Sequence, residues 1–165
     1  MLRWLKRKQN EKKAEKTLDR IKPGVNLVMR IAKRLPTFES SKQLTSQTGR
    51  EVILYVDTRF EAELFSFLQE KKIMKKFRMI AEFAMSDRYS DDIYGHEKNS
   101  EKSKDVCAIK ICVLGNHRIY CKEFFAPRIK RIVLIEHVNK KINSFNNELR
   151  RLVDRLGEYN YEFQG

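Results

Sequence analysis

The chain is poor in the residues from which disulfide frameworks and metal clusters are built. Three cysteines and three histidines stand among its 165 residues. The cysteines (Cys107, Cys112 and Cys121) are odd in number, have no CxxC spacing and fall in strand-like segments, so we interpret them as thiols of a reducing compartment. The histidines do not form a zinc-ligand pattern. We therefore expect no metal site and no cofactor.

Long apolar runs are also missing. The longest run in the strand-rich region, Ile132–Ile135, is far shorter than the roughly 20 residues that a membrane-spanning helix needs. Met1–Gln9 alternates bulky and basic residues without a continuous apolar region, which is unlike a secretory signal. We expect a cytoplasmic protein without a membrane partner.

Acidic residues are too few to balance the basic ones, and the formal net charge is +13. Residues 1–50 carry 14 basic and 4 acidic side chains (+10), residues 51–100 carry 8 and 10 (−2), and residues 101–165 carry 13 and 8 (+5). An excess of this size favours an anionic partner such as RNA, DNA, a ribosome or an acidic protein. Charge alone does not choose among these.

Glycine and proline are scarce, so the few that occur mark boundaries. Pro23-Gly24 and Pro36 enclose apolar residues at helical spacing, which predicts a helix from Val25 to Leu35. Residues 37–50 are rich in Ser, Thr and Gln and are typical of a linker. We therefore predict a basic helical extension with its linker at 1–49 and a compact domain at 50–165.

The extension has two interpretations. It is either an arm that grips RNA or another anionic surface, or a helix packed on the domain with its charged side in solvent. A homodimer formed through the extension is a further expectation.

The predicted domain begins with a strand, Glu51–Asp57, in which apolar residues alternate. Thr58 and Glu61 have the spacing of a capping box, and two helices follow before a polar loop at 86–103. The three aspartates of that loop do not match a calcium-binding loop. A last helix is predicted to be capped by Asn143 or Ser144 and to end at Gly157.

Between the loop and the last helix, three β-prone runs predict an antiparallel meander: Val106–Leu114, Arg118–Phe125 and Arg131–Val138. A three-residue loop at 115–117 would pair Val113 with Ile119 and Ile111 with Cys121, giving the first hairpin one apolar face. The opposite face would then hold five side chains: Lys110, Cys112, Arg118, Tyr120 and Lys122.

This order of elements resembles the RelE/ParE superfamily of bacterial toxins, in particular its HigB-like, phage-derived branch. The resemblance spans residues 51 to about 158 and rests on GNHRIY (Gly115–Tyr120) and on IVLIEHVNKK (Ile132–Lys141). It implies an α+β fold: a mostly antiparallel, four-stranded sheet with a helical hairpin after the first strand and a C-terminal helix. The extension at 1–49 would be added to that fold.

The resemblance also implies a function, that of a ribosome-associated mRNA endoribonuclease made as the toxin of a type II toxin–antitoxin pair. Its partners would be mRNA, the ribosome and a cognate antitoxin. Cleavage by the RNA's own 2′-OH needs a base, an acid and donors for the charged phosphorane, but no metal ligands.

Candidate residues for this chemistry lie in the predicted meander. Arg118 would hold the phosphate through its guanidinium fork, with Lys110 beside it, and His137 would act as acid or base. Glu123 or Glu136 is an alternative base. The expected nucleic-acid contacts are Tyr120, Lys122, Lys140 and Lys141.

Plainer interpretations remain open for each candidate. Arg118 is also explained as a solubilising charge after a turn, His137 as a half-buried histidine, and Tyr120 as support for the hairpin. At the level of function, the alternatives are a non-catalytic module that binds RNA, the ribosome or a protein, and a gyrase-directed toxin of the ParE type.

Overall fold

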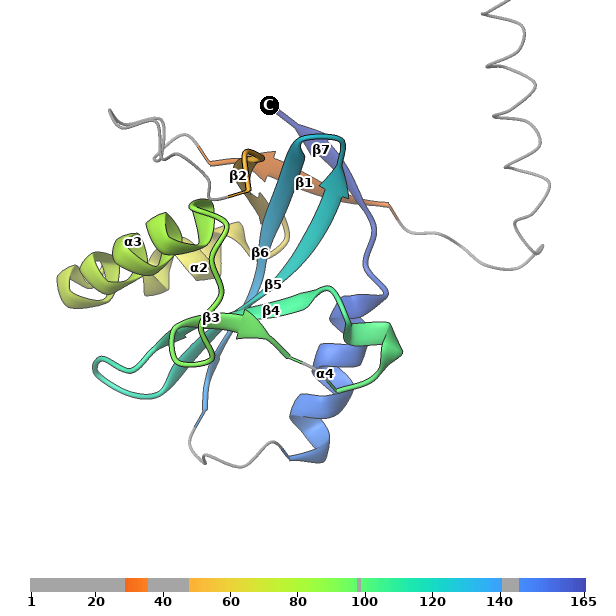
Figure 1. Ribbon diagram of the computed structural model, residues 1–165. Coiled ribbons are helices and arrows are strands. Elements are labelled where there is room, and N and C mark those ends of the chain that lie inside the picture. Colours follow the sequence, from red (N-terminus) through yellow and green to blue (C-terminus); the bar gives the residue numbers. More distant parts are fainter. Residues whose placement is uncertain (1–28, 36–47, 98, 141–145) are drawn as a thin grey trace, which may run out of the picture.

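A curled, mixed sheet of seven strands organises the protein (Figure 1). The structure is a computed structural model, and it describes residues 29–35, 48–97, 99–140 and 146–165. In chain order the elements are β1 (Arg30–Arg34), β2 (Glu51–Asp57), α2 (Glu61–Phe67), α3 (Lys71–Met85), β3 (Tyr94–His96), the 3₁₀ turn η2 (Glu101–Ser103), β4 (Val106–Ile111), β5 (His117–Ala126), β6 (Ile129–Asn139), α4 (Asn147–Gly157) and β7 (Tyr161–Gln164).

The strands follow the order β3-β4-β5-β6-β2-β1-β7 across the sheet. β2 runs parallel to β6 and β1 runs parallel to β7, whereas the other neighbours are antiparallel. The expected four-stranded, mostly antiparallel RelE-like sheet is therefore wrong. Three further strands account for the difference: β1 and β3 come from segments predicted as helix and loop, and β7 comes from residues for which no element was predicted.

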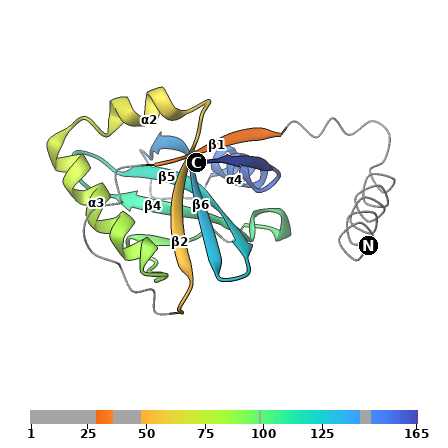
Figure 2. The same ribbon diagram turned by 90° about the horizontal axis from the view of Figure 1, so that it is seen from above.

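Helices cover both faces of the curled sheet (Figure 2). α2 and α3 pack on one face over Leu54, Ile119 and Ile132, and α4 packs on the other face over Tyr120 and Val133. We call these the α3 face and the α4 face. β6 lies at the centre of the strand order, so its run Ile132–Ile135 is buried on both faces. That position explains a continuous apolar run in place of an alternating one.

β1 corrects the prediction of a helix from Val25 to Leu35 for the part that the structure describes. Arg30–Arg34 lies between β2 and β7, and Ala32 is fully buried against the α4 face. Pairing with two neighbouring strands satisfies the backbone of this short segment, and tertiary contacts of that kind commonly override helical periodicity.

The first hairpin keeps the predicted faces but not the predicted pairing. Ile109 pairs with Ile119 and Ile111 pairs with His117, so the loop comprises the five residues 112–116 and not three. Leu114 and Gly115 both adopt positive φ there, which a continuing strand does not allow. The observed pairing is shifted from the predicted one by an even number of residues, so each side chain stays on its predicted face. Ile109, Ile111 and Ile119 therefore still face one core. Cys112 lies in the loop and is exposed.

Both predicted helix caps differ from those observed. α2 begins after Phe60 without a side-chain cap, and Asp57 accepts a hydrogen bond from the Arg59 backbone in place of the Thr58 capping box. At α4 the cap is Asn146, whose side chain accepts from the Leu149 backbone N–H. Asn143 and Ser144 lie outside the described residues.

Gly157 ends α4, as the sequence indicates, and close packing explains the glycine. A β-carbon at this position would lie 1.9 Å from the Lys102 carbonyl oxygen. Any side chain would therefore push α4 away from η2, which joins β3 to β4 beside the helix.

Candidate functional site

One end of the meander gathers three cations on the α4 face. Lys110 on β4 is the direct pairing partner of Arg118 on β5. Lys140 follows β6, and its backbone N–H donates to the Asn116 carbonyl oxygen at 2.7 Å. Desolvation, together with the charges of Arg118 and Lys110, lowers the pKa of Lys140. We call Lys110, Arg118 and Lys140 the basic cluster.

Tyr120 lies beside the basic cluster, two residues after Arg118 on the same face of β5. Its side chain is buried, and burial and the charges of Glu97 and Glu136 raise its pKa to about 12, against the opposing charge of Arg118. The phenol therefore stays protonated at neutral pH, with acidic groups and a guanidinium close to it.

Glu136 pairs directly with Tyr120, so its carboxylate belongs to the same face. Burial raises the pKa of Glu136, and the nearby charge of Glu63 adds to this, although Arg155 on α4 opposes the shift. Arg155 Nη2 lies 3.5 Å from Glu136 Oε2. The carboxylate is thus held in a partly dehydrated position with a raised proton affinity.

Three side-chain atoms of this face are buried and form no hydrogen bond within the described ranges: Nη1 of Arg118, Oε2 of Glu136 and, farther along β6, Nε of Arg131. Of these, Glu136 Oε2 has the long ion pair with Arg155. Buried polar atoms are satisfied in the great majority of cases, so each exception calls for a reason. A guanidinium nitrogen without a hydrogen bond and a carboxylate oxygen with only a long ion pair match a ligand that offers anionic acceptors and a hydroxyl proton.

A β-bulge brings Glu136 to this face. Tyr120 pairs with Glu136 but the next residue, Cys121, pairs with Leu134, which leaves Ile135 as an extra residue in β6. One extra residue inverts the alternation of every side chain beyond it. Without the bulge, His137 would share the face of Arg118. With it, Glu136 takes that face and His137 turns to the α3 face.

His137 therefore does not meet Arg118, although the sequence placed the two in one site. It pairs with Ile119, and its ring stacks on Phe67 of α2 at a centroid distance of 3.7 Å. Its Nε2 lies 3.0 Å from Nδ1 of His117, and Nε2 of His117 lies 3.1 Å from the Leu114 carbonyl oxygen.

These contacts assign the protons of the histidine pair. Because the Leu114 carbonyl only accepts, His117 donates from Nε2, and its Nδ1 then accepts from Nε2–H of His137. Burial and the neighbouring His117 both lower the pKa of His137. His137 is therefore a neutral, stacked ring near pH 7, in an arrangement that supports the hairpin against α2.

The other predicted contacts are placed differently. Lys122 lies on the α4 face, but its ammonium is buried and donates to the carbonyl oxygens of Gly157 and Tyr159, each at 2.7 Å. A cation at the C-terminus of a helix is stabilised by the helix dipole, so Lys122 acts as a cap for α4. Lys141 lies outside the described residues.

A second polar centre lies on the α3 face and was missed by sequence reasoning, apart from Glu123. Lys130 is fully buried, and its ammonium lies 2.8 Å from Glu123 Oε1 and 3.0 Å from Asp87 Oδ1. The hydroxyl of Tyr94 donates to Glu123 Oε1 at 2.6 Å, and that of Tyr89 donates to Oε2 at 2.8 Å.

Charges fix the protonation of this centre. Burial alone would raise the pKa of Glu123, but the His96 hydrogen bond and the Lys130 ammonium outweigh it and lower the pKa to about 2. Asp87 also has a lowered pKa, because Thr48, Lys130 and Arg50 outweigh its burial. The sequence carried one signal for this centre. Glu123 lies two residues after Cys121, and Lys130 lies two residues before Ile132, so both charged residues alternate in step with residues that face the core.

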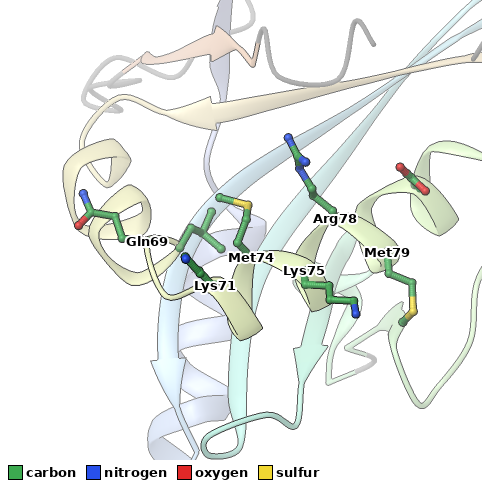
Figure 3. Close-up of a pocket in the computed structure, with 8 residues that line it drawn as sticks. Gln69, Lys71, Met74, Lys75, Arg78 and Met79 are labelled. Atoms are coloured by element: carbon green, nitrogen blue, oxygen red, sulfur yellow. The ribbon is translucent and has the colours of Figure 1, made fainter. Parts of the chain in front are cut away.

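A groove runs along the outer side of α3 and is rimmed by cations (Figure 3). Lys71, Lys75 and Arg78 line it together with Met74 and Met79. The groove continues between β1, α2 and α3 as a hollow of ≈ 460 Å³, with an apolar floor and with basic side chains from β1. Its lining is Lys33, Arg34, Leu35, Glu61, Phe65, Leu68, Gln69, Met74, Phe77 and Arg78.

Comparisons with known proteins give no relative for this chain. No family model, no curated protein and no solved structure matches it. No helix in the ranges that the structure describes is long and apolar enough to span a membrane.

Proposed function

We propose that the protein binds single-stranded RNA on the α4 face and cleaves it by attack of the RNA's own 2′-OH. The observation that carries the proposal is the pair of buried atoms beside the basic cluster, Arg118 Nη1, which forms no hydrogen bond, and Glu136 Oε2, which has only the 3.5 Å ion pair with Arg155. Each atom offers one of the interactions that this reaction needs: a donor for phosphate and an acceptor for a proton.

The roles follow from the charge and position of each group. Glu136 takes the proton of the 2′-OH, because its raised pKa makes it a stronger base than an ordinary carboxylate. The 2′ oxygen then forms the bond to phosphorus while the bond to the 5′ oxygen breaks. Arg118 stabilises the charge that develops on the phosphorane, and a guanidinium is well suited to this because its fork matches phosphate geometry.

The two lysines of the basic cluster complete the site. Lys110 holds the adjacent backbone phosphate by its charge. Lys140 supplies a proton to the leaving 5′ oxygen, and its lowered pKa makes its ammonium a better acid than that of an ordinary lysine. Glu136 takes the role of base that the sequence had suggested for His137.

Cleavage and binding of a labelled single-stranded RNA by the full chain test the proposal. We expect Glu136→Gln and Arg118→Ala to slow cleavage by about 100-fold or more, the scale of one lost acid–base group or transition-state donor. Lys72→Ala, an exposed lysine on α3, is the matched control and should change neither rate nor affinity by more than a small factor.

Three outcomes separate the alternatives. Salt-dependent RNA binding without cleavage would favour a non-catalytic module. Loss of both activities to the same extent in Arg118→Ala would make that residue a plain phosphate contact. An absence of RNA binding would refute the proposal.

The cellular setting is proposed from the RelE/ParE resemblance alone: a cytoplasmic toxin that cuts mRNA on the ribosome and is neutralised by an antitoxin. Expression of the chain should then arrest growth with cleavage of mRNA, and Arg118→Ala should relieve the arrest. Growth arrest with intact mRNA would instead favour a gyrase-directed toxin.

A second function, protein binding, is favoured by the groove on α3. We infer that the groove takes an acidic, amphipathic segment of a partner protein, such as an antitoxin would supply. Five basic side chains line the groove and its continuation (Lys33, Arg34, Lys71, Lys75 and Arg78), against two acidic ones, Glu61 and Glu82. The exposed fractions of Phe65 and Met79, 39% and 47%, leave an apolar surface between these charges.

A synthetic amphipathic peptide with leucine on one side and glutamate on the other tests this inference. It should bind the full chain, and its affinity should fall at least about tenfold in Arg78→Glu, because a like charge then faces the peptide. Lys104→Glu, an exposed position near η2, is the control. Equal binding of a version with lysine in place of glutamate would contradict the inference.

A further inference from the structure

Three neighbouring strands bring a histidine, a cysteine and a glutamate together on the α3 face. His96 on β3 pairs directly with Cys107 on β4, and Cys107 pairs with Cys121 on β5. Glu123 lies two residues beyond Cys121 and so shares its face. A ring nitrogen of His96, Sγ of Cys107 and a carboxylate oxygen of Glu123 all lie within 4.8 Å of one another.

We propose that His96, Cys107 and Glu123 bind a zinc ion. A tetrahedral zinc ion with ligands at about 2.0–2.3 Å needs ligand atoms roughly 3.3–3.8 Å apart, so a contraction of about 1 Å completes the site. His96 is half-buried and belongs to a short edge strand, which makes it the ligand best able to move.

The donor set selects the metal. Imidazole nitrogen and thiolate sulfur suit zinc, whereas magnesium and calcium prefer oxygen ligands only. Three protein ligands leave a fourth position for water or a substrate atom. Tyr89 lies beside two of the three ligands: its ring stacks on His96 at 4.6 Å, its hydroxyl donates to Glu123 Oε2, and it is 41% exposed.

The neighbouring charges are compatible with a cation here. Zinc binding displaces the Cys107 proton to solvent, so Zn²⁺ with one thiolate, one carboxylate and neutral His96 has no net charge. The ammonium of Lys130 retains its ion pair with Asp87, at 3.0 Å, when zinc binds to Glu123. Arg50, whose side chain is 34% exposed, pairs with the same Asp87 carboxylate. Lys130 bonds to Oε1 of Glu123, so Oε2 is the ligand atom, and the metal replaces its present contacts with the Tyr89 hydroxyl and with His96 Nε2 at 3.4 Å.

This site is independent of the proposed RNA site. Glu123 lies on the α3 face and Glu136 on the α4 face, so variants of one need not affect the other. A bound zinc would tie the edge strand β3 to β4 and β5, and it would add a Lewis acid with an open position to the α3 face.

Titration of the reduced, chelator-treated full chain with Zn²⁺ and with Co²⁺ tests the proposal. We expect one metal per chain and, with Co²⁺, the charge-transfer absorption of a cobalt–thiolate bond. Cys107→Ala should abolish that absorption, whereas Cys112→Ser, the exposed cysteine on the β4–β5 loop, should leave it unchanged. His96→Ala should weaken Zn²⁺ binding by at least about 100-fold, above the 10–100-fold typical of outer-sphere positions.

Tyr89→Phe gives a second, opposite readout. It frees Glu123 Oε2 from the tyrosine hydroxyl, so Zn²⁺ affinity should rise. If Cys107→Ala fails to fold, His96→Ala and Tyr89→Phe still test the zinc site. Both residues are partly exposed, so their substitution should leave the protein folded. The proposal is overturned if the chain binds no Co²⁺, binds it without the thiolate absorption, or binds Zn²⁺ equally well after His96→Ala.

Discussion

Lys130 has no solvent-exposed surface, and its ammonium lies within hydrogen-bonding distance of two carboxylates and of the Tyr89 hydroxyl. Burying a charge is costly unless it is paired and fully hydrogen-bonded, and here every proton of the ammonium has an acceptor. The arrangement thus tolerates the burial without making the ion pair a large source of stability. It makes the loss of one partner severe, because the others stay buried and unpaired.

Lys130→Met should therefore destabilise the protein by about 3–5 kcal/mol, the cost of leaving a buried carboxylate uncompensated. Urea unfolding followed by circular dichroism measures this change in the free energy of unfolding. Lys72→Met, exposed on α3, is the matched control and should stay within about 0.5 kcal/mol of wild type. Equal stabilities for the two variants would mean that Lys130 is reached by water.

Glu123 makes stability depend on pH. Its folded-state pKa of about 2 is below the ordinary value of 4.5, so the unfolded chain binds the proton more tightly. The stability contributed by this group, on the order of 3 kcal/mol, is fully present above pH 4.5 and is lost as the pH falls towards 2. Unfolding free energies measured between pH 7 and pH 2 test this. The loss over that range should be smaller in Glu123→Gln.

At the scale of elements, the Asp57 side chain links three strands that are distant in the sequence, β2, β1 and β7. It ends β2, and its Oδ2 accepts from the Arg30 guanidinium on β1 at 3.2 Å and from the Tyr161 hydroxyl on β7 at 2.8 Å. The carboxylate is fully buried. The sheet edge formed by β1 and β7 therefore depends on one acidic side chain as well as on its backbone ladder.

Tyr161→Phe tests the position of β7. It removes a hydrogen bond to a buried charged group, so we expect a loss of about 1–3 kcal/mol in the free energy of unfolding. Tyr159→Phe is the control, because Tyr159 meets Lys122 through its backbone carbonyl oxygen and Arg30 through its ring face, and phenylalanine keeps both contacts. Identical melting temperatures for the two variants would contradict the pairing of β7 with β1.

Local pattern predicted some elements well because their sequence signals were complete. Glu51–Asp57 alternates between clear boundaries and has the bounds of the observed strand β2. The hairpin faces were also right, since parity decides which side chains meet. The predicted register of the hairpin was wrong, because Val113 and Leu114 are apolar and were counted as strand residues. In the structure they belong to the loop, where Leu114 has positive φ.

The elements that pattern did not predict are short or depend on distant partners. β3 and β7 have three and four residues, too few for a periodic signal, and β1 has helical spacing by coincidence. The same limit applies to the site. The sequence predicted that Lys110 and Arg118 share a face, because side chains alternate along paired strands. The bulge at Ile135 depends on how β6 pairs with β5, and this bulge turns His137 to the other face.

At the scale of the molecule, the two faces of the sheet have different chemistry. The α4 face carries the basic cluster and a carboxylate with a raised pKa, whereas the α3 face carries a buried, charge-balanced centre and a basic groove. Most of the positive charge, +10, belongs to residues 1–50, which come before the residues of both centres in the sequence. Affinity for RNA and cleavage of RNA should therefore respond to different parts of the chain.

Deleting residues 1–28 separates these contributions while leaving β1 in the sheet. The deletion removes nine basic and three acidic side chains. If these residues act through phosphate charge, affinity for single-stranded RNA should fall, and the salt dependence should drop by roughly one unit of slope per lost phosphate contact. The melting temperature and the cleavage rate at saturating RNA should stay close to those of the full chain.

Deleting residues 1–48 is the contrasting variant, and it should behave differently. It also removes β1, which separates β2 from β7 and buries Ala32 completely, so the melting temperature should fall sharply. A lower melting temperature already in the 1–28 deletion, with unchanged RNA affinity, would mean that the first residues pack on the domain and do not grip RNA. The same two measurements, run on both deletions, therefore decide between the two interpretations of the extension.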